Sequence, residues 1–177
     1  AIEADGNLES PAPRERVHVS ASFFDPGFAD THAASIDWGN GMMTWAQIIR
    51  TGDTTWSVLD DHTYEEGGIY TITLTARDDD QGMDVATTTA VVTGVGVQDG
   101  VLQVIGTANR DTVRLQLVAP EPTGDTKSAA PQISVNASFL HEAGARRTRG
   151  RGHRARDVGR TYDTEKITDI LVILARG

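Results

Sequence analysis

The sequence predicts an all-β protein, an immunoglobulin-like antiparallel β-sandwich followed by a smaller, truncated β-region. Short runs of alternating apolar and polar residues recur along the chain between turn residues, and no run has a convincing helical period. The clearest run is Ile69–Arg77, whose alternate residues are apolar and share one face: Tyr70, Ile72, Leu74 and Ala76. Strands at this spacing are typical of β-sandwiches.

The first half of the chain opens with two predicted strands and a hairpin. Val17–Phe24 alternates apolar and polar residues, and the turn residues Asp25-Pro26-Gly27 end it. A short strand at Ser35–Trp38 ends at Gly39-Asn40-Gly41, and Asn-Gly between two apolar runs is a strong hairpin signal. We therefore expect the return strand at Thr44–Arg50.

Further strands of the predicted sandwich lie at Thr55–Leu59 and Asp84–Thr93, on either side of the clearest run. Tyr70 follows a Gly-Gly turn at the start of its strand, which is the position of the tyrosine corner in Greek-key sandwiches. Trp38 is the natural core residue between the two sheets.

Gly94-Val95-Gly96 is interpreted as a junction. It places the sandwich at residues 16–93 and a second β-region at residues 94–177, after a linker or initial strand at residues 1–15. The second region has predicted strands at residues 100–105, 112–118, 132–140 and 167–174.

Two segments of the second region lack the pattern of a strand. Residues 119–131 contain three prolines and are predicted to form a loop. Residues 141–160 hold seven arginines against two acids, with no apolar period, and are predicted to form a disordered loop. Its arginine run at residues 146–154 could bind phosphates or a sulfated glycan, or the loop could simply be flexible and rest against the acidic sandwich.

Composition excludes several classes of function. A net charge of −9 makes the chain a poor match for nucleic acid or an anionic membrane, and no apolar run is long enough to span a bilayer. The absence of cysteine excludes a disulfide framework, a thiolate zinc site and a cysteine nucleophile. No catalytic set can be singled out, so we expect a monomeric, non-enzymatic piece of a longer polypeptide.

Five short motifs follow one another in the predicted sandwich: Asp25-Pro26-Gly27, Ile36-Asp37-Trp38-Gly39-Asn40-Gly41, His62-Thr63-Tyr64, Gly68-Ile69-Tyr70-Thr71-Ile72-Thr73-Leu74 and Asp79-Asp80-Gln81-Gly82. In this order they resemble the PKD (polycystic kidney disease) domain, an immunoglobulin-like β-sandwich. Two positions depart from the family pattern: Asn40 stands where an acid is usual, and Trp38 follows Asp37 instead of preceding it. His62 is interpreted as a packed or hydrogen-bonded residue and not as a ligand.

The PKD resemblance implies a non-catalytic module, extracellular or at the cell surface, for adhesion, spacing or interaction with protein or polysaccharide. It also implies neighbouring domains in a longer chain, commonly in bacterial proteins. The alternative is an accessory substrate-binding domain of a secreted protease or polysaccharide-degrading enzyme. That alternative predicts exposed aromatic residues such as Trp45 or Trp56, although the sequence leaves open whether these lie in the core or on the surface.

The second half carries a weaker similarity. Gly106–Val113 is similar to one turn of the glycine-rich calcium repeat of hemolysin-type proteins, with Thr107 and Asn109 in place of glycines. Successive turns of that repeat share each ion, so a single copy does not build a site.

A calcium site is predicted at the acidic turn that follows the clearest strand. Asp78, Asp79 and Asp80 end that strand, near where Asp25 and Asp37 could also come. Calcium takes six to eight oxygen ligands, so several converging carboxylates would suit it. The alternative is a solvated turn in which the aspartates accept hydrogen bonds from backbone N–H groups.

Overall fold

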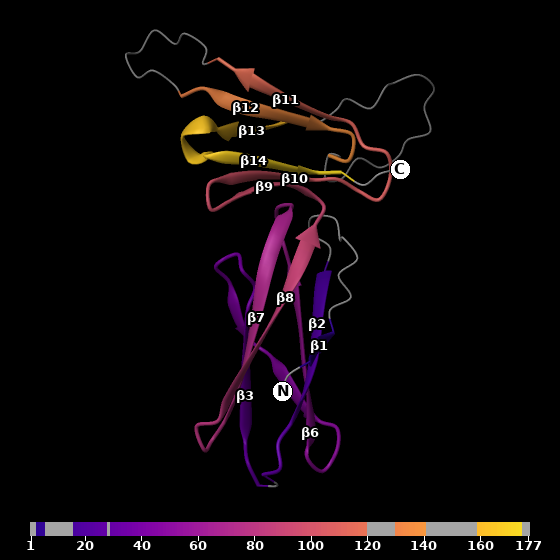
Figure 1. The fold of residues 1–177 in the computed structure, drawn as a ribbon, viewed down its shortest axis with the longest axis vertical. Helices are drawn as coiled ribbons and strands as arrows, with labels where there is room; N and C mark the ends of the chain where they lie inside the picture. Colours follow the sequence, from indigo (N-terminus) through magenta and orange to yellow (C-terminus); the bar gives the residue numbers. More distant parts are fainter. Residues whose placement is uncertain (1–2, 6–15, 28, 120–129, 141–158, 175–177) are drawn as a thin grey trace. The chain divides into compact units, whose positions relative to one another are not determined.

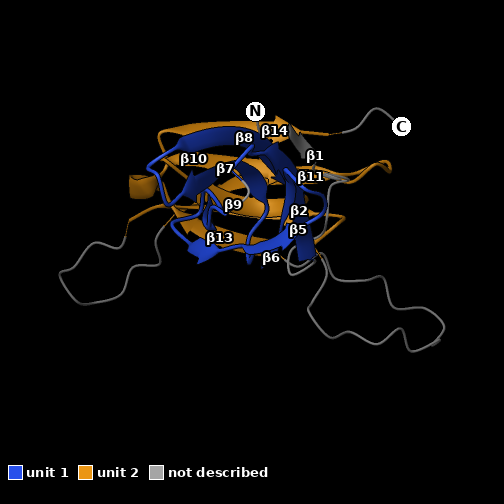
Figure 2. Ribbon diagram, turned by 90° about the horizontal axis from the view of Figure 1, so that it is seen from below, with its two compact units in different colours: residues 1–92 blue, residues 93–177 orange. Residues whose placement is uncertain are grey.

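The computed structural model describes residues 3–5, 16–27, 29–119, 130–140 and 159–174. The chain divides into two compact units, residues 1–92 and residues 93–177, which Figure 2 distinguishes by colour. Each unit consists of β-strands, with one short 3-10 helix in the described part of the second (Figure 1). The predicted all-β class is confirmed.

Unit 1 is a sandwich of two four-stranded antiparallel sheets. The first sheet has the order β1 (Glu3–Asp5), β2 (Arg16–Phe24), β6 (Thr55–Thr63), β5 (Gln47–Arg50). The second sheet has the order β4 (Met43–Trp45), β3 (His32–Asp37), β7 (Gly68–Asp78), β8 (Met83–Val92). The predicted strand at residues 69–77 is therefore β7, an inner strand of the second sheet.

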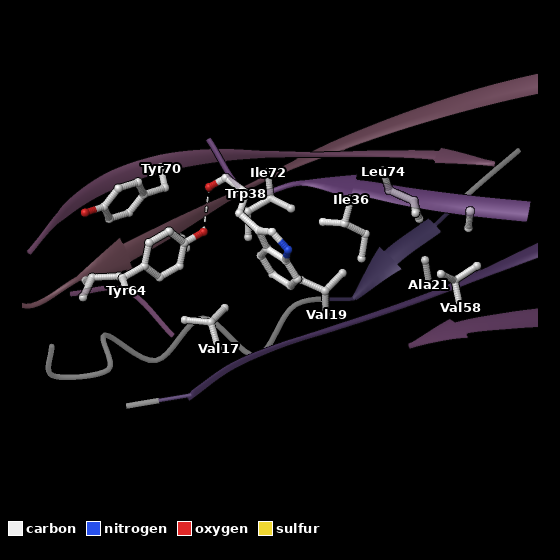
Figure 3. Close-up of a cluster of buried hydrophobic side chains, with 13 residues drawn as sticks. Val17, Val19, Ala21, Ile36, Trp38, Val58, Tyr64, Tyr70, Ile72 and Leu74 are labelled. Carbon is white, nitrogen blue, oxygen red and sulfur yellow. Dashed lines mark hydrogen bonds between the residues drawn. The ribbon is translucent and has the colours of Figure 1, made fainter. Parts of the chain in front are cut away.

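The core of unit 1 lies between these sheets because each strand has one apolar face. The alternate residues of β7 that were predicted to share one face are all buried: Tyr70, Ile72, Leu74 and Ala76. The first three belong to one cluster with the buried Val17, Val19 and Ala21 of β2. Figure 3 shows Trp38 in the middle of this cluster, where it is fully buried as predicted.

Trp38 is held by a hydrogen-bond network that satisfies its polar atoms. Its Nε1 donates to Thr44 Oγ1 at 2.9 Å, and the Thr44 hydroxyl donates in turn to Asp60. The Tyr64 hydroxyl donates to the Trp38 carbonyl at 2.8 Å, drawn as the dashed line in Figure 3. Buried polar groups must find such partners, so these bonds fix the position of the indole.

The predicted tyrosine corner is confirmed. The Tyr70 hydroxyl donates to the Glu66 carbonyl at 2.9 Å, four residues upstream, which is the bond that defines this corner. The Tyr70 ring stacks on Tyr64, with ring centroids 4.0 Å apart.

The predicted return strand at residues 44–50 is wrong in one respect, because it is two strands. β4 pairs with β3 in the second sheet, whereas β5 pairs with β6 in the first sheet. The chain passes between the sheets at Ala46, whose N–H still donates to the Ala34 carbonyl at 2.9 Å. Ile48 then packs against the core from the opposite side.

Unit 2 contains two three-stranded sheets. The first has the order β14 (Asp169–Ile173), β10 (Val101–Ile105), β9 (Gly94–Gln98), and β14 runs parallel to β10. The second has the order β11 (Val113–Val118), β12 (Gln132–Ala137), β13 (Gly159–Asp163), and a 3-10 helix, η1 (Thr164–Lys166), follows β13. Buried residues from both sheets, together with Leu140, form one cluster: Val95, Leu102, Val104, Val135, Ala137 and Leu140.

The predicted junction at residues 94–96 lies next to the boundary between the two units, and these residues also form the start of β9, which pairs antiparallel with β10. One prediction for the second region needs correction: Gly159 and Arg160, predicted as the end of the arginine-rich loop, begin β13 because they pair with β12. The rest of that loop, residues 141–158, and residues 120–129 of the proline-containing loop lie outside the described residues.

Candidate functional site

Four of the five predicted calcium ligands lie at one end of the unit 1 sandwich. Asp78 pairs with His32 across the sheet, and Asp25 and His32 line one hollow together with Asp78. Asp79 accepts a hydrogen bond from the Thr31 N–H at 3.1 Å. We call this region the acidic end and define it by five carboxylates: Asp25, Asp30, Asp78, Asp79 and Asp80.

Asp30 is the member of the acidic end that sequence reasoning missed. Partial burial raises the pKa of Asp30, and the neighbouring charges of Asp25, Asp79, Asp80 and Asp78 raise that pKa further. The folded acidic end therefore holds more negative charge than its surroundings favour. No turn or strand pattern marks Asp30, because its proximity to Asp78–Asp80 comes from the pairing of β3 with β7.

Asp37 does not belong to this group, so that part of the predicted ligand set is wrong. It pairs with Thr73 at the other end of β3, five residues from His32, or roughly 16 Å along the strand. There its Oδ1 accepts a hydrogen bond from the Gly39 N–H at 2.9 Å.

Asp25, Asp78 and Asp79 of the acidic end accept hydrogen bonds from the protein's own backbone. Asp25 Oδ1 accepts from the Gly27 N–H at 2.7 Å, and Asp78 Oδ1 accepts from the Gly82 N–H at 2.6 Å. In the described part of the chain, no group of three or more His, Cys, Asp or Glu side chains is arranged to hold a metal ion. The arrangement fits turn-capping aspartates better than a formed calcium site, and calcium binding stays a prediction.

A buried histidine lies behind the acidic end. The His32 side chain is only 3% exposed, and its Nε2 lies 2.7 Å from Asp25 Oδ2. Its ring contacts Phe23 and Trp56, with centroids 5.1 and 4.5 Å away. The hydrogen bond from His32 lowers the pKa of the Asp25 carboxyl, so Asp25 stays ionised in mildly acidic solution.

Trp56 belongs to this aromatic cluster with Phe23 and His32, so it is packed against the protein and is not a surface tryptophan. It is partly buried, stacks on Phe23 and lies under the Arg50 guanidinium, 5.4 Å from the ring centroid. Trp45 is its opposite, with 73% of its surface exposed. The sequence left both positions open, and the structure makes Trp45 the surface tryptophan.

Trp45 stands at the border of a continuous surface on the second sheet of unit 1. Because Ile36, Thr44 and Leu74 turn inward, the residues that alternate with them face out. Cross-strand pairing places Trp45 in a row with Ser35, Thr75 and Val85. The next rows are Met43, Asp37, Thr73 and Thr87, and then Thr71 and Thr89. We call these ten residues the outer face.

The outer face combines an exposed aromatic ring with many hydroxyl groups. Met43 beside Trp45 is 63% exposed, and Asp37 is the one charged residue of the ten. This mixture of an apolar platform and hydrogen-bonding side chains is the composition that polar ligands with apolar faces require.

His62 has the structural role that was predicted for it. Its ring stacks on Trp38, with centroids 4.9 Å apart, and meets the edge of Tyr64. His62 Nε2 and Asn40 Nδ2 are 2.9 Å apart, so Asn40, which departs from the family pattern, serves the hairpin. Burial lowers the pKa of His62, which therefore stays neutral near pH 7.

The segment that is similar to a calcium repeat forms a closed turn in unit 2. Asp111 Oδ2 accepts from the Thr107 N–H at 2.6 Å, and Asp111 Oδ1 accepts from the Ser138 hydroxyl at 3.3 Å. Asp111 thus fixes the connection between β10 and β11. The arginine run at residues 146–154, considered for anion binding, lies outside the described residues.

No protein-family model matches the chain, and no curated protein matches it. The solved structures to which it is similar include the PKD domain of an M14-like peptidase from Thermoplasmatales archaeon SCGC AB-540-F20. The TM-score is 0.42 at 19% sequence identity, and the match covers 51% of this chain and 91% of that chain. The PKD resemblance of this chain therefore continues to depend on its five sequence motifs. No helix among the described residues is long and apolar enough to cross a membrane.

Proposed function

We propose that unit 1 is a non-catalytic interaction module that holds an extended polymer against its outer face. The observation that carries this proposal is Trp45, a large aromatic residue left 73% exposed beside rows of threonine and serine. A folded protein gains by burying such a ring, so an exposed one next to polar side chains suits a ligand.

Polysaccharide is the polymer class that suits this surface best. One face of a sugar ring carries C–H groups that can stack on the Trp45 indole, while its hydroxyls need donors and acceptors. Ser35, Thr75 and Asp37 offer both, within two neighbouring cross-strand rows. Charge is sparse on the outer face, which suits a neutral chain better than a strongly charged one.

An extended protein segment is the second candidate ligand. Met43 lies one row from Trp45 and is also exposed, and methionine adapts to the varied side chains of a protein partner. Both ligands fit an adhesion module and an accessory domain beside a catalytic domain. The extracellular or cell-surface placement is supported by the PKD resemblance of the sequence motifs.

In this proposal, calcium would stabilise the fold of unit 1 at the acidic end and would not take part in polymer binding. The carboxylates of the acidic end repel one another, and Asp30 has a raised pKa because of them, so a divalent cation would reduce that repulsion. Thermal unfolding with EDTA, and then with millimolar calcium or magnesium, tests this. A rise specific to calcium supports a site, equal rises with both ions indicate screening alone, and no rise removes the ion from the proposal.

Polymer binding is tested by co-sedimentation of the full chain with insoluble cellulose, chitin and fibrous collagen. Trp45→Ala should weaken binding by at least tenfold, which is about 1.4 kcal/mol. Phe24→Ala is the matched control, because Phe24 is also an exposed aromatic, at 61%, but lies at the acidic end. Loss of binding in both variants, or a wild type that binds none of the three polymers, contradicts the proposal.

A further inference from the structure

The turn between β3 and β4 contains the only Asn-Gly pair of the sequence, Asn40-Gly41. Both residues are exposed, and Gly41 has a φ of 81°. A Cβ built on Gly41 would meet no atom within 4 Å, so nothing crowds its backbone on that side. Among the described residues, no group accepts a hydrogen bond from the Gly41 N–H. The Gly41 nitrogen is therefore accessible to water and to the side chain before it.

The Asn40 side-chain amide is held at both of its polar atoms. Its Oδ1 accepts from the Met42 N–H at 3.1 Å, and its Nδ2 lies 2.9 Å from His62 Nε2. Because His62 is neutral near pH 7, its Nε2 can accept from Nδ2, so both bonds agree on which end of the amide is oxygen. The Met42 bond closes a small ring that contains both Asn40 Cγ and the Gly41 nitrogen. These two atoms are therefore kept close together.

We propose that Asn40 is a self-modification site, where the Gly41 backbone nitrogen displaces the side-chain nitrogen as ammonia and the turn acquires a carboxylate. The Gly41 nitrogen gives its proton to water and bonds to Asn40 Cγ, and the C=O electron pair moves onto Oδ1. When that pair returns, the Cγ–Nδ2 bond breaks and Nδ2 leaves with a proton taken from water. The product is a cyclic imide between Asn40 and Gly41.

Water then opens the imide at one of its two C–N bonds. Cleavage at Cγ gives aspartate, and cleavage at the backbone carbonyl carbon gives isoaspartate, in which the chain continues through the side-chain carbon. The net change is one water consumed and one ammonia released, so the reaction needs no oxidant, reductant or enzyme.

The turn supports this reaction in two ways. The Met42 N–H lies where negative charge develops on Oδ1, as the donors of an oxyanion hole do. Glycine at position 41 puts no side chain beside the attacking nitrogen. Asn109 lacks the second feature: it is also exposed and lies in a turn, but Arg110 follows it. Asn40 should therefore react well before Asn109.

Conversion to aspartate changes the surroundings of His62. An amide that donates to Nε2 is replaced by a carboxylate that can only accept, so the imidazolium form is favoured and the pKa of His62 rises. Asp60 already acts in the same direction, and the rings of Trp38 and Tyr64 pack against the imidazole. The modified turn thus holds an ion pair stacked on the core residue Trp38.

Peptide mass mapping of the full chain, incubated folded at mildly alkaline pH, tests the modification. We expect a gain of one dalton at residue 40, roughly tenfold faster than at Asn109, and a similar slowing at residue 40 in Gly41→Ala. No gain at residue 40 of the folded chain overturns the proposal, even if the urea-unfolded chain reacts. Equal rates at Asn40 and Asn109, or a Gly41→Ala variant as fast as the wild type, also overturn it.

NMR titration of the imidazole in Asn40→Asp tests the effect on His62. The pKa of His62 should be higher than in the wild type, whereas Gln81→Glu, the matched control, adds the same charge at the acidic end and should leave it unchanged. An unchanged pKa in Asn40→Asp, or an equal rise in both variants, contradicts the ion pair. Polymer binding through Trp45 is measured separately, so either result can fail without the other.

Discussion

Tyr64→Phe removes a single hydroxyl from the core of unit 1 and tests how its parts are held. Tyr64 is 1% exposed and Trp38 is 0% exposed, and the tyrosine hydroxyl donates to the Trp38 carbonyl at 2.8 Å. Burial raises the pKa of Tyr64, so the hydroxyl stays a neutral donor across the whole physiological range. Phenylalanine keeps the ring but leaves a buried carbonyl without this donor, which costs about 1–3 kcal/mol.

Urea unfolding followed by tryptophan fluorescence measures this cost, because Trp38 lies at the perturbed position. A loss of about 1–3 kcal/mol should appear at an unchanged denaturant slope. If unit 1 unfolds on its own, the melting temperature should fall by about 4–8 °C for each kcal/mol.

Tyr70→Phe is the comparison for this experiment. Its hydroxyl donates to the carbonyl of Glu66, an exposed residue, so water can replace the lost bond and the cost should be smaller. A Tyr64→Phe variant as stable as the wild type, or one less affected than Tyr70→Phe, would refute the role assigned to this bond.

Three further predictions concern the hairpin, the acidic end and the buried histidine. Gly39→Ala should destabilise unit 1 more than Gly41→Ala. Both glycines have positive φ angles, 73° and 81°, but a Cβ on Gly39 would lie 2.4 Å from a backbone oxygen of β7, whereas a Cβ on Gly41 would meet no atom within 4 Å. Thermal unfolding of the two variants measures the difference. Asp80→Asn should raise the melting temperature at low salt because it relieves the repulsion on Asp30, and the gain should shrink at high salt; a loss of stability contradicts this. The pKa of His62 is lowered in the folded protein, so the unfolded chain binds more protons below about pH 6.5 and the stability of unit 1 should decrease as the pH is lowered below that value. His62→Gln should lack this contribution to the pH dependence, and identical stability–pH profiles for the variant and the wild type would contradict the prediction.

The core of unit 1 could be predicted because its signals are local. The alternation in β2 and β7 places the buried residues directly, and the Gly-Gly turn before Tyr70 marks the tyrosine corner. Trp38 follows from the same logic, since a large aromatic at the end of a strand fills the space between two sheets. Nothing beyond a few residues of context is needed for these inferences.

The parts that were missed depend on which strands become neighbours. The run at residues 44–50 has no local mark at Ala46, where the chain leaves one sheet for the other. Asp37 was expected to come near Asp78–Asp80 together with Asp25, but the register of β3 on β7 places it at the other end of β3. The burial of His32 likewise comes from contacts with two other strands, and no pattern in its own strand shows it.

The same dependence on strand pairing explains why the sequence predicts only part of the outer face. Trp45 was one of two open alternatives for an exposed aromatic, and its strand gives no signal that it lies at a sheet border. In the sequence, the threonines of β7 and β8 alternate with apolar residues, which marks only the polar side of each single strand. Only the pairing of β3, β7 and β8 joins them into one surface beside the indole.

The most direct test of the outer face is residue-level mapping by NMR with soluble cello- and chito-oligosaccharides and a collagen peptide. The account predicts that amide shifts on titration cluster in β3, β4, β7 and β8, with the Trp45 indole N–H among the largest, and that Trp45→Ala abolishes them. Shifts confined to the acidic end or to unit 2, or the absence of any shift with all three ligands, would contradict it.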